Sequence, residues 1–262
     1  MARETESVLF EKVSAVARIT LNRPDKYNSL NAALALQLQE VLDRCREATD
    51  LRAVYLTGAG QAFCAGQDLQ EVTGDEAPTF ETILGKHLHP IVRKIRALEL
   101  PVVCGVNGVA AGAGANIALA CDLTVATESA TFIQAFSKIG LVPDTGGSYL
   151  LPRLVGPQRA AALTMLGEQL SAAEAAAMGL IYRAVPDADF EAAAMGLAER
   201  LAAMPTRALA LTKQALQAAF HHDFDQQLDL EQTLQVAAGS TYDYREGVEA
   251  FIEKRRPAFK GK

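Results

Sequence analysis

The sequence predicts an α/β fold, with a mixed core over residues 1–200 and a helical region over residues 201–262. Two observations lead to this prediction. Short apolar runs alternate with amphipathic segments in the first half, a pattern that favours parallel strands in βαβ units. After about residue 140 the pattern becomes helical and rich in Ala and Leu. We therefore expect a parallel sheet followed by a mainly helical C-terminal part.

The strands are predicted from β-type apolar runs bounded by turn residues. Val13–Leu21 reads as the first strand, because the Asn-Arg-Pro-Asp sequence that follows it is typical of a turn. The other expected strands are Ala53–Leu56, Val102–Val106, Leu123–Ala126 and a small one at Ile181–Val185.

The helices are predicted from apolar residues repeating at helical spacing. In the first helix this face consists of Leu34, Leu38, Val41, Leu42 and Cys45. An Ala-rich helix should follow the glycines near residue 112, and Ser171 with Glu174 fits a capping box. Later helices are expected at 148–154, 158–166, 172–178, 190–204 and 206–220, with helical patterning continuing to residue 253.

Composition excludes several classes of protein. A net charge of −6 and the lack of a basic face argue against nucleic-acid binding, and no apolar run is long enough for a membrane span. Four cysteines without metal-type spacing, and no signal peptide, lead us to expect a cytoplasmic protein. Basic residues gather at Arg23 and Lys26 and again over 254–262, either as a solvated surface or as contacts for an anionic ligand.

Two glycine-containing segments, 63–69 and 107–115, each follow a predicted strand. Glycine allows the backbone to approach a ligand closely, and a helix that begins there presents free N–H groups. Two such donors would form an oxyanion hole. Neither a third glycine in Gly-x-Gly-x-x-Gly spacing nor a Gly-Lys-Ser/Thr follows, so no nucleotide motif is present. Tight packing of a strand on a helix is the alternative explanation of these glycines.

Asp144 stands in a turn framed by Pro143 and Gly146. It could be a helix N-cap, a proton-transfer group, or both. His87 and His89 could form half of a metal site, but no matching ligands lie nearby in the sequence, so a helix surface or pocket wall is the preferred interpretation. No Gly-x-Ser-x-Gly motif of a serine hydrolase is present.

Together these segments resemble the crotonase, or enoyl-CoA hydratase/isomerase, superfamily from about Val8 to the C-terminus. The resemblance is carried by 66–69, 108–115, 136–144 and 242–262, and is nearest to the ring-1,2-epoxyphenylacetyl-CoA isomerases of bacterial phenylacetate catabolism. It implies a spiral of ββα turns, with a helical C-terminal region that assembles trimers or dimers of trimers. The expected partners are an acyl-CoA substrate and further copies of the chain.

The resemblance also implies roles for individual residues. Backbone N–H groups of Gln67 and Ala113 would form the oxyanion hole, and Asp144 would be the acid–base residue. Coenzyme A, as part of the substrate, would be the only cofactor-like group, and no metal is expected. Its binding residues would be Lys26, Ala65, Asp68, Leu69 and Gly112, with Lys254 or Lys260 from this or a neighbouring subunit.

The departures from the family pattern favour an isomerase. Hydratases of this family carry two glutamates where this chain has Asn116 and Phe136, neither of which can transfer a proton to or from water. Aryl-CoA dehalogenases, which share the aspartate, use a Trp that this chain lacks. The expected reactions are conversion of an epoxide of phenylacetyl-CoA into an oxepin, or of a 3-enoyl-CoA into a 2-enoyl-CoA. A 2-enoyl-CoA hydratase and a non-catalytic CoA-binding protein remain alternatives. The acyl group stays open, because segments such as 74–88 would shape the pocket.

Overall fold

A computed structural model of the chain describes residues 6–73 and 77–262. Its larger sheet has six strands in the order β1-β2-β3-β5-β7-β10, and every neighbouring pair except β1 with β2 is parallel. This agrees with the parallel sheet that the sequence predicts. The strands are β1 (Val8–Val13), β2 (Val16–Leu21), β3 (Ala53–Gly58), β5 (Val102–Val106), β7 (Leu123–Thr127) and β10 (Arg183–Val185).

The prediction of one strand over Val13–Leu21 is wrong, because the chain turns back on itself at Ser14 and Ala15. β1 and β2 form an antiparallel hairpin in which Val13 pairs with Val16. Ser14 takes the left-handed conformation with φ of 57° that such a turn demands. The turn contains none of the Gly, Asn or Asp residues that usually announce it.

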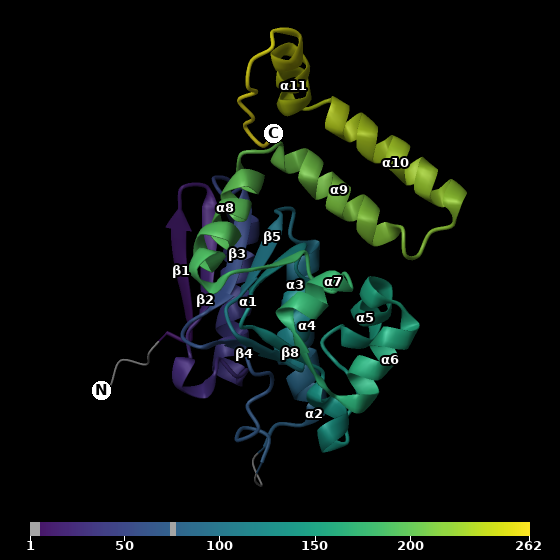
Figure 1. Cartoon of the computed structure of the whole chain (residues 1–262). Coiled ribbons are helices and arrows are strands. Elements are labelled where there is room, and N and C mark those ends of the chain that lie inside the picture. Colours follow the sequence, from purple (N-terminus) through teal and green to yellow (C-terminus); the bar gives the residue numbers. More distant parts are fainter. Residues whose placement is uncertain (1–5, 74–76) are drawn as a thin grey trace.

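The two faces of this sheet are covered by different helices (Figure 1). Ala53 and Tyr55 of β3 point to α8 (Phe190–Ala202), with which they form one apolar cluster. The alternate residues Val54 and Leu56 belong to the main core, together with α1 (Ala32–Glu47) and α3 (His89–Ala97). This alternation follows from the two-residue period of a strand.

A second, smaller sheet of four strands lies beside the first. Its order is β4-β6-β8-β9, with β4, β6 and β8 parallel and β9 antiparallel to β8. The strands are β4 (Ala62–Cys64), β6 (Val109–Ala111), β8 (Thr131–Ile133) and β9 (Gln169–Ser171). The three parallel carboxyl ends lead directly into residues 65–68, 112–113 and 134–144. Segments distant in the sequence are thereby brought to one edge of a sheet.

The remaining predicted helices of the core are confirmed to within a few residues. The Ala-rich helix is α4 (Ala113–Ala120), and the capping box of Ser171 and Glu174 is present at the start of α7 (Ala172–Ala177). The predicted helices at 148–154 and 158–166 are α5 (Gly147–Val155) and α6 (Pro157–Leu166). Not predicted were α2 (Phe80–Thr82) and a π-helix over Ile83–Leu88, in a stretch expected to be a loop. Short 3₁₀ segments span Pro24–Lys26, Ala135–Ile139 and Asp187–Asp189.

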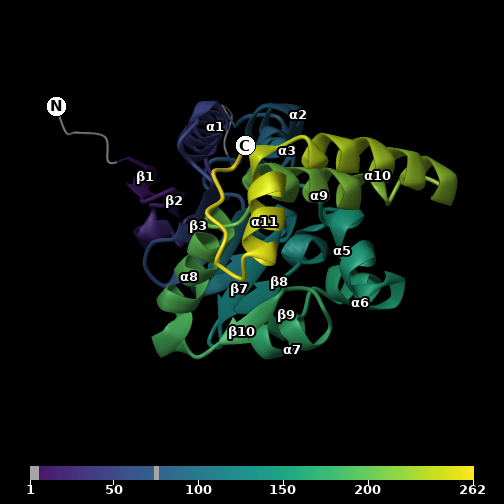
Figure 2. The same ribbon diagram turned by 90° about the horizontal axis from the view of Figure 1, so that it is seen from above.

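The C-terminal helices project from the body of the molecule (Figures 1 and 2). They are α9 (Thr206–Ala218), α10 (Phe224–Gly239) and α11 (Tyr242–Ile252), in agreement with the predicted helical region. α10 packs antiparallel to α9, and α11 with the last residues returns to the body. Within residues 6–73 and 77–262, no helix combines the length and apolar character that crossing a bilayer requires.

Arg52 joins the body to both ends of this C-terminal region. Its guanidinium donates to the carbonyl oxygens of Met204 and Phe259, at 2.5 and 2.7 Å, and to the Thr206 hydroxyl at 3.0 Å. The buried carboxylates of Asp243 and Glu246 in α11 accept hydrogen bonds from tail backbone N–H groups, including that of Lys260 at 2.6 Å. The C-terminal tail is therefore held by hydrogen bonds between its backbone and the side chains of Arg52, Asp243 and Glu246.

Candidate active site

The three segments that follow β4, β6 and β8 enclose a cavity of about 480 Å³. Most of its wall is apolar and is formed by Leu69, Val72, Phe80, Ile83, Leu88, Phe136, Ile139 and Leu141. Asp144 and Lys138 are the charged residues that line it. An apolar cavity with a few convergent polar groups is the usual form of a small-molecule site.

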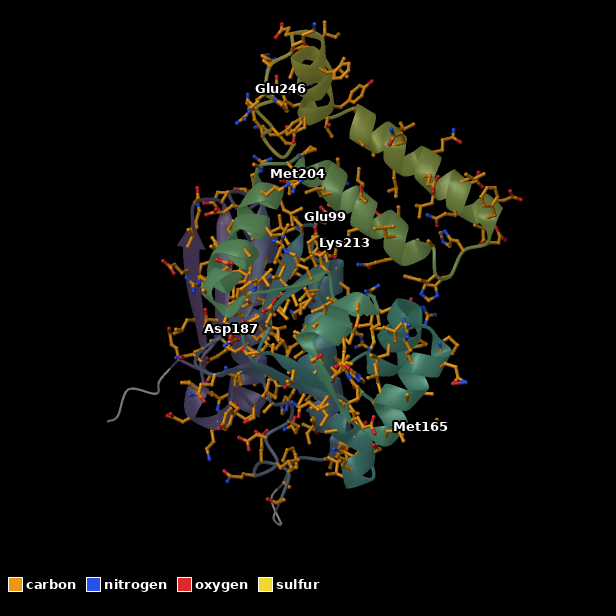
Figure 3. All side chains as sticks on the ribbon, viewed as in Figure 1. Glu99, Met165, Asp187, Met204, Lys213 and Glu246 are labelled. Atoms are coloured by element: carbon orange, nitrogen blue, oxygen red, sulfur yellow. The ribbon has the colours of Figure 1, made fainter. Side chains whose placement is uncertain are left out.

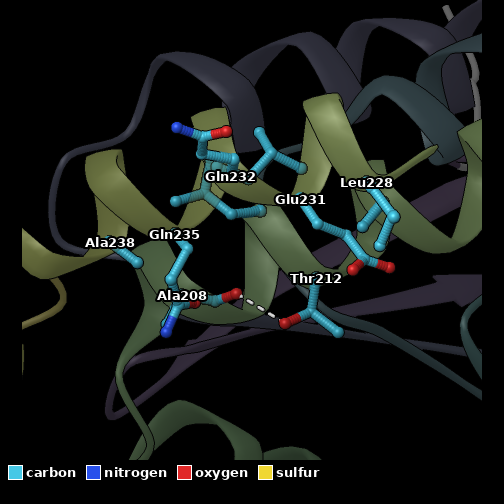
Figure 4. A pocket seen from close by; sticks show the side chains of 10 residues that line it. Ala208, Thr212, Leu228, Glu231, Gln232, Gln235 and Ala238 are labelled. Carbon is cyan, nitrogen blue, oxygen red and sulfur yellow. Dashed lines mark hydrogen bonds between the residues drawn. The ribbon is translucent and has the colours of Figure 1, made fainter. Parts of the chain in front are cut away.

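Size alone does not select this cavity. A groove of similar volume, about 500 Å³, lies between α9 and α10 (Figure 4). Its lining includes one carboxylate, Glu231, among Ala, Leu, Thr and Gln side chains of two helices, and no glycine segment reaches it. The cavity beside Asp144 instead combines a carboxylate with the backbone of two glycine segments. We therefore regard it as the candidate active site.

The two glycine segments approach each other at this cavity. Gly66 has φ of 89°, and a Cβ built on it would lie 2.8 Å from the Ala111 carbonyl oxygen and 3.7 Å from the Ala113 nitrogen. A side chain could not be accommodated there, so glycine is what permits the approach. Gly66 and Asp68 are also held by backbone hydrogen bonds with Leu30 of 2.7 and 2.9 Å.

Gln67 and Ala113 both line the cavity, as the sequence predicted. Within residues 6–73 and 77–262, neither backbone N–H has an acceptor. Ala113 is the first residue of α4, whose opening N–H groups have no partner inside the helix. These two amides are thus available to a ligand oxygen in the cavity.

Asp144 is partly buried at the start of the turn before α5. Its Oδ1 accepts a hydrogen bond of 2.7 Å from the Thr145 hydroxyl. Its backbone carbonyl accepts from the Gly147 N–H at 2.7 Å and from the Asn116 side-chain amide at 2.9 Å. The cap position of α5 belongs to Gly146, without a side-chain cap, so the alternative that Asp144 is an N-cap is wrong. Its carboxylate is left facing the cavity.

Burial raises the pKa of the Asp144 carboxyl above its ordinary value, because the apolar surroundings disfavour its charged form. The hydrogen bond from Thr145 and the charge of His89 act in the opposite direction and only partly offset the burial. A carboxyl group with a raised pKa is better suited to return a proton than an ordinary aspartate.

Asn116 and Phe136, which stand where hydratases of the family carry glutamates, have different surroundings. Asn116 is fully buried, and its amide bonds the Asp144 carbonyl rather than facing the cavity. Phe136 lines the cavity with 6% of its surface exposed and lies beside Gly112. No carboxylate other than that of Asp144 lines this cavity in the described part of the chain.

The residues predicted to bind coenzyme A divide into two groups. Ala65, Leu69 and Gly112 line the cavity. Lys26 and Asp68 do not line it. Lys26 is exposed and donates to the Gln70 side chain at 3.1 Å. Burial alone would raise the pKa of Asp68, but the hydrogen bond and charge of Arg23, 2.9 Å away, outweigh it and lower that pKa.

Lys254 and Lys260 lie in the C-terminal tail, far from the cavity of the same chain. The Lys260 ammonium stacks on the Tyr242 ring, 4.1 Å from its centroid, and Lys254 is exposed. α11 and the tail stand at one end of the molecule, whereas α2, which borders the cavity, stands at the other (Figure 1). The structure does not bring these lysines and the cavity together within one chain.

Sequence reasoning missed Lys138 as a neighbour of the site and the effect of His89 on Asp144. Leu88 does line the cavity, which confirms the pocket-wall interpretation for that segment, and His89 acts on the pKa of Asp144. The π-helix before His89, a turn type frequent at functional sites, becomes visible only in the structure. Of the expected wall 74–88, residues 74–76 lie outside the described residues. No cluster of three potential metal ligands occurs in the described ranges.

Comparison with known proteins gives consistent matches. The family model for enoyl-CoA hydratase/isomerase matches residues 11–262. The chain is 46% identical over 260 residues to the 1,2-epoxyphenylacetyl-CoA isomerase of Escherichia coli (strain K12), covering 98% of this chain and 99% of that protein. It is also 46% identical over 256 residues to a Rhodobacter capsulatus protein named "Probable enoyl-CoA hydratase", covering 98% of each.

A solved structure of the same family shows the same similarity in three dimensions. The crystal structure of an enoyl-CoA hydratase from Bacillus anthracis superposes with a TM-score of 0.92 at 35% identity, covering 98% of this chain and 100% of that one.

Proposed function

The chain belongs to the enoyl-CoA hydratase/isomerase, or crotonase, family, and from this premise we propose that it isomerises acyl-coenzyme A thioesters through a thioester enolate. Family membership also confirms the predicted fold class, a crotonase-like α/β spiral with a helical C-terminal region. Asp144 is the proposed acid–base residue. Gln67 and Ala113 are proposed to donate their backbone N–H groups to the thioester oxygen.

The chemistry follows from the groups at the cavity. A thioester makes its α-carbon acidic, and two N–H donors stabilise the negative charge that develops on the oxygen of the enolate. Removing one such donor from an enzyme typically costs about 3 to 4 kcal/mol of transition-state stabilisation. The Asp144 carboxylate takes a proton from C2 of a 3-enoyl-CoA and returns it to C4, while the double bond moves from C3–C4 to C2–C3.

The observation that carries this proposal is that, among the described residues, Asp144 alone brings a carboxylate to this apolar cavity. In the hydratases of this family two glutamates handle water, and here Asn116 is turned to the Asp144 carbonyl while Phe136 lines the wall. A single carboxylate suffices to move a proton between two carbons of one bound molecule. The apolar wall would keep water away from the enolate.

The acyl group is proposed from the same wall. An epoxide of ring-oxidised phenylacetyl-CoA, opening to a seven-membered oxepin, and a linear 3-enoyl-CoA both present apolar carbon to it. The Escherichia coli relative supports the first of these, and the equal identity of this chain to a protein named as a hydratase keeps hydration as the rival activity. The Asp144 environment favours isomerisation over that rival.

Coenzyme A is proposed to enter past Ala65, Leu69 and Gly112, with Lys26 at the rim. Because Lys254 and Lys260 lie far from the cavity of their own chain, their proposed contact with coenzyme A requires a neighbouring subunit. We further propose a trimer or a dimer of trimers. Exposed apolar residues on α10 and α11, among them Val236, Phe251 and Ile252, support this assembly.

The decisive experiment compares the wild type with Asp144→Asn. The amide keeps the shape of the carboxyl group but cannot accept a proton. Isomerisation of 3-enoyl-CoA and of the epoxide should fall by at least about a thousandfold, while affinity for the product CoA ester stays within a few-fold. Substrate consumption, product NMR and titration calorimetry measure these quantities.

The same assays separate the alternatives. Hydration of crotonyl-CoA by the wild type should be orders of magnitude slower than isomerisation. Rapid hydration would make the protein a hydratase, and tight CoA binding without turnover of any acyl-CoA in a broad panel would make it a non-catalytic binder. Near-normal isomerisation by Asp144→Asn would remove the proposed role of this residue.

A further inference from the structure

The turn that carries Asp144 is strained. Thr145 and Gly146 both take left-handed backbone conformations, with φ of 51° and 85°. Glycine adopts this region freely, but a β-branched residue such as threonine rarely does. Thr145 is also fully buried. A strained turn persists only where its surroundings hold it in place.

Two hydrogen bonds hold this turn at one atom, the backbone carbonyl oxygen of Asp144. The Gly147 N–H donates at 2.7 Å and the Asn116 amide at 2.9 Å, so both lone pairs of the oxygen are occupied. A Cβ on Gly147 would lie 2.4 Å from the Asn116 amide nitrogen. Glycine at this position therefore leaves the room that the Asn116 side chain occupies.

The orientation of Asn116 is fixed by what faces its two ends. A carbonyl oxygen can only accept, so the amide nitrogen faces Asp144 and the amide oxygen points the other way. There it accepts a hydrogen bond of 2.9 Å from the Gln134 side chain. Gln134 is 5% exposed, and its own amide oxygen has no partner in the described part of the chain. The Gln134 side chain thus orients Asn116 while its own amide oxygen stays unpaired among the described residues.

We propose that Asn116 is a positioning residue for Asp144: its amide, oriented by Gln134, holds the strained turn so that the carboxylate faces the bound substrate. This inference rests on the proposed acid–base function of Asp144. Asn116 does not touch the reacting atoms, since its amide is buried behind the turn. It acts through the backbone of the residue that does.

The test is Asn116→Ala, with Thr57→Val as the matched control. Thr57 is buried and donates to the Gly105 carbonyl at 2.9 Å, so its replacement also removes a buried bond to a backbone carbonyl, but away from the cavity. A shift of about 1 Å in a reacting group typically lowers a rate about a hundredfold. We expect kcat of Asn116→Ala to fall tenfold to a hundredfold, with KM and product affinity within about threefold. Thr57→Val should keep the wild-type kcat.

The pH profile provides a readout that a purely structural role would not move. A displaced Asp144 carboxylate gains water, so the burial that raises its pKa weakens, and the acid limb of kcat moves to lower pH. The other charged groups at the site, His89 of α3 and Lys138 of the 3₁₀ segment, are unchanged in this variant. Thr57→Val should leave the limb where it is.

The outcomes distinguish the two proposals. A folded Asn116→Ala protein with wild-type kcat and acid limb, beside an inactive Asp144→Asn, overturns the positioning role alone. Activity in both variants overturns the proposed function itself. Should Asn116→Ala fail to fold, Gln134→Met replaces it, because it leaves Asn116 in place but removes the donor that orients it. A smaller fall in kcat with the same movement of the limb is then expected, and an unchanged kcat and limb would contradict the inference.

Discussion

Burial and two neighbouring groups shift the pKa of the Asp144 carboxyl in opposite directions. Burial raises its pKa, while the Thr145 hydroxyl and the charge of His89 lower it. Since a general base works only when deprotonated, isomerisation should decline as the pH falls through this raised pKa. The decline should therefore begin above the pH of about 3.9 that is typical of a free aspartate.

Thr145→Val tests the contribution of the hydroxyl. Valine keeps the β-branched shape but cannot donate to Oδ1, so an influence that lowers the pKa of Asp144 is lost and the pKa rises further. The acid limb of kcat should move to higher pH, while kcat on the alkaline plateau stays within about tenfold. Thr145→Ser, which retains the hydroxyl, should keep the wild-type limb. An identical pH profile for the valine variant would show that the hydroxyl does not act on the carboxylate.

The candidate residues of the site could be read from the sequence, but their partners could not. Glycines and a Pro–Gly frame marked the segments with unusual backbone, the family resemblance pointed to Gln67, Ala113 and Asp144 within them, and all three line one cavity. That Asn116, 28 residues away, supports Asp144 depends on how α4 and α5 pack. The influence of His89 likewise depends on tertiary placement.

Among the elements, α9 is attached to the body by an ion pair whose lysine is buried and whose aspartate is partly exposed. The Lys213 ammonium donates to Asp122 at 2.9 Å and to the Ile95 carbonyl at 2.9 Å, and its side chain is 9% exposed. Burial raises the pKa of Asp122, and Lys213 opposes that rise. The folded protein thus holds the Asp122 proton more tightly than the unfolded chain does, so the stability from this group is lost as the pH rises through its folded pKa.

Lys213→Met should destabilise the fold by about 1 to 2 kcal/mol near neutral pH, because it leaves a partly exposed carboxylate without its partner. The loss should be smaller at about pH 5, where a further raised pKa allows Asp122 to take up a proton. Urea unfolding at both pH values measures the difference. Arg207→Met on the same helix is the control. Its pair with Glu99 is exposed, so its loss should cost no more than about 1 kcal/mol.

How well each helix or strand could be predicted from the sequence depended on its length. The helices α8 and α9 and the apolar strands β5 and β7 were predicted to within two residues, whereas α10 and α11 were expected only as continued helical patterning. The strands of the smaller sheet have three residues each, and β4 and β6 lie inside or beside the two glycine-containing segments. Three residues are too few to establish a period, so the sheet that positions the site could not be predicted from local pattern.

For the whole molecule, the proposed assembly predicts a particle of three or six chains. Phe251 is 85% exposed on α11, and its replacement by Glu should reduce the mass measured by light scattering. Met165→Glu is the control, since Met165 is 74% exposed but lies at the opposite end of the molecule from Glu246 of α11 (Figure 3). A wild-type protein that scatters as a single chain at micromolar concentration would contradict the assembly.

Arg52 has a consequence for the order in which the fold is completed. Its hydrogen bonds reach Met204 and Phe259, which lie 152 and 207 residues further along the chain. A contact between such distant residues has to overcome the entropy of closing a long loop, and it cannot form until both ends have been synthesised. The parallel sheet that contains β3 and β5 needs none of these late residues. During translation the Arg52 side chain therefore remains hydrated until the tail has been synthesised. Its contact with the tail is among the last native interactions that the growing chain completes.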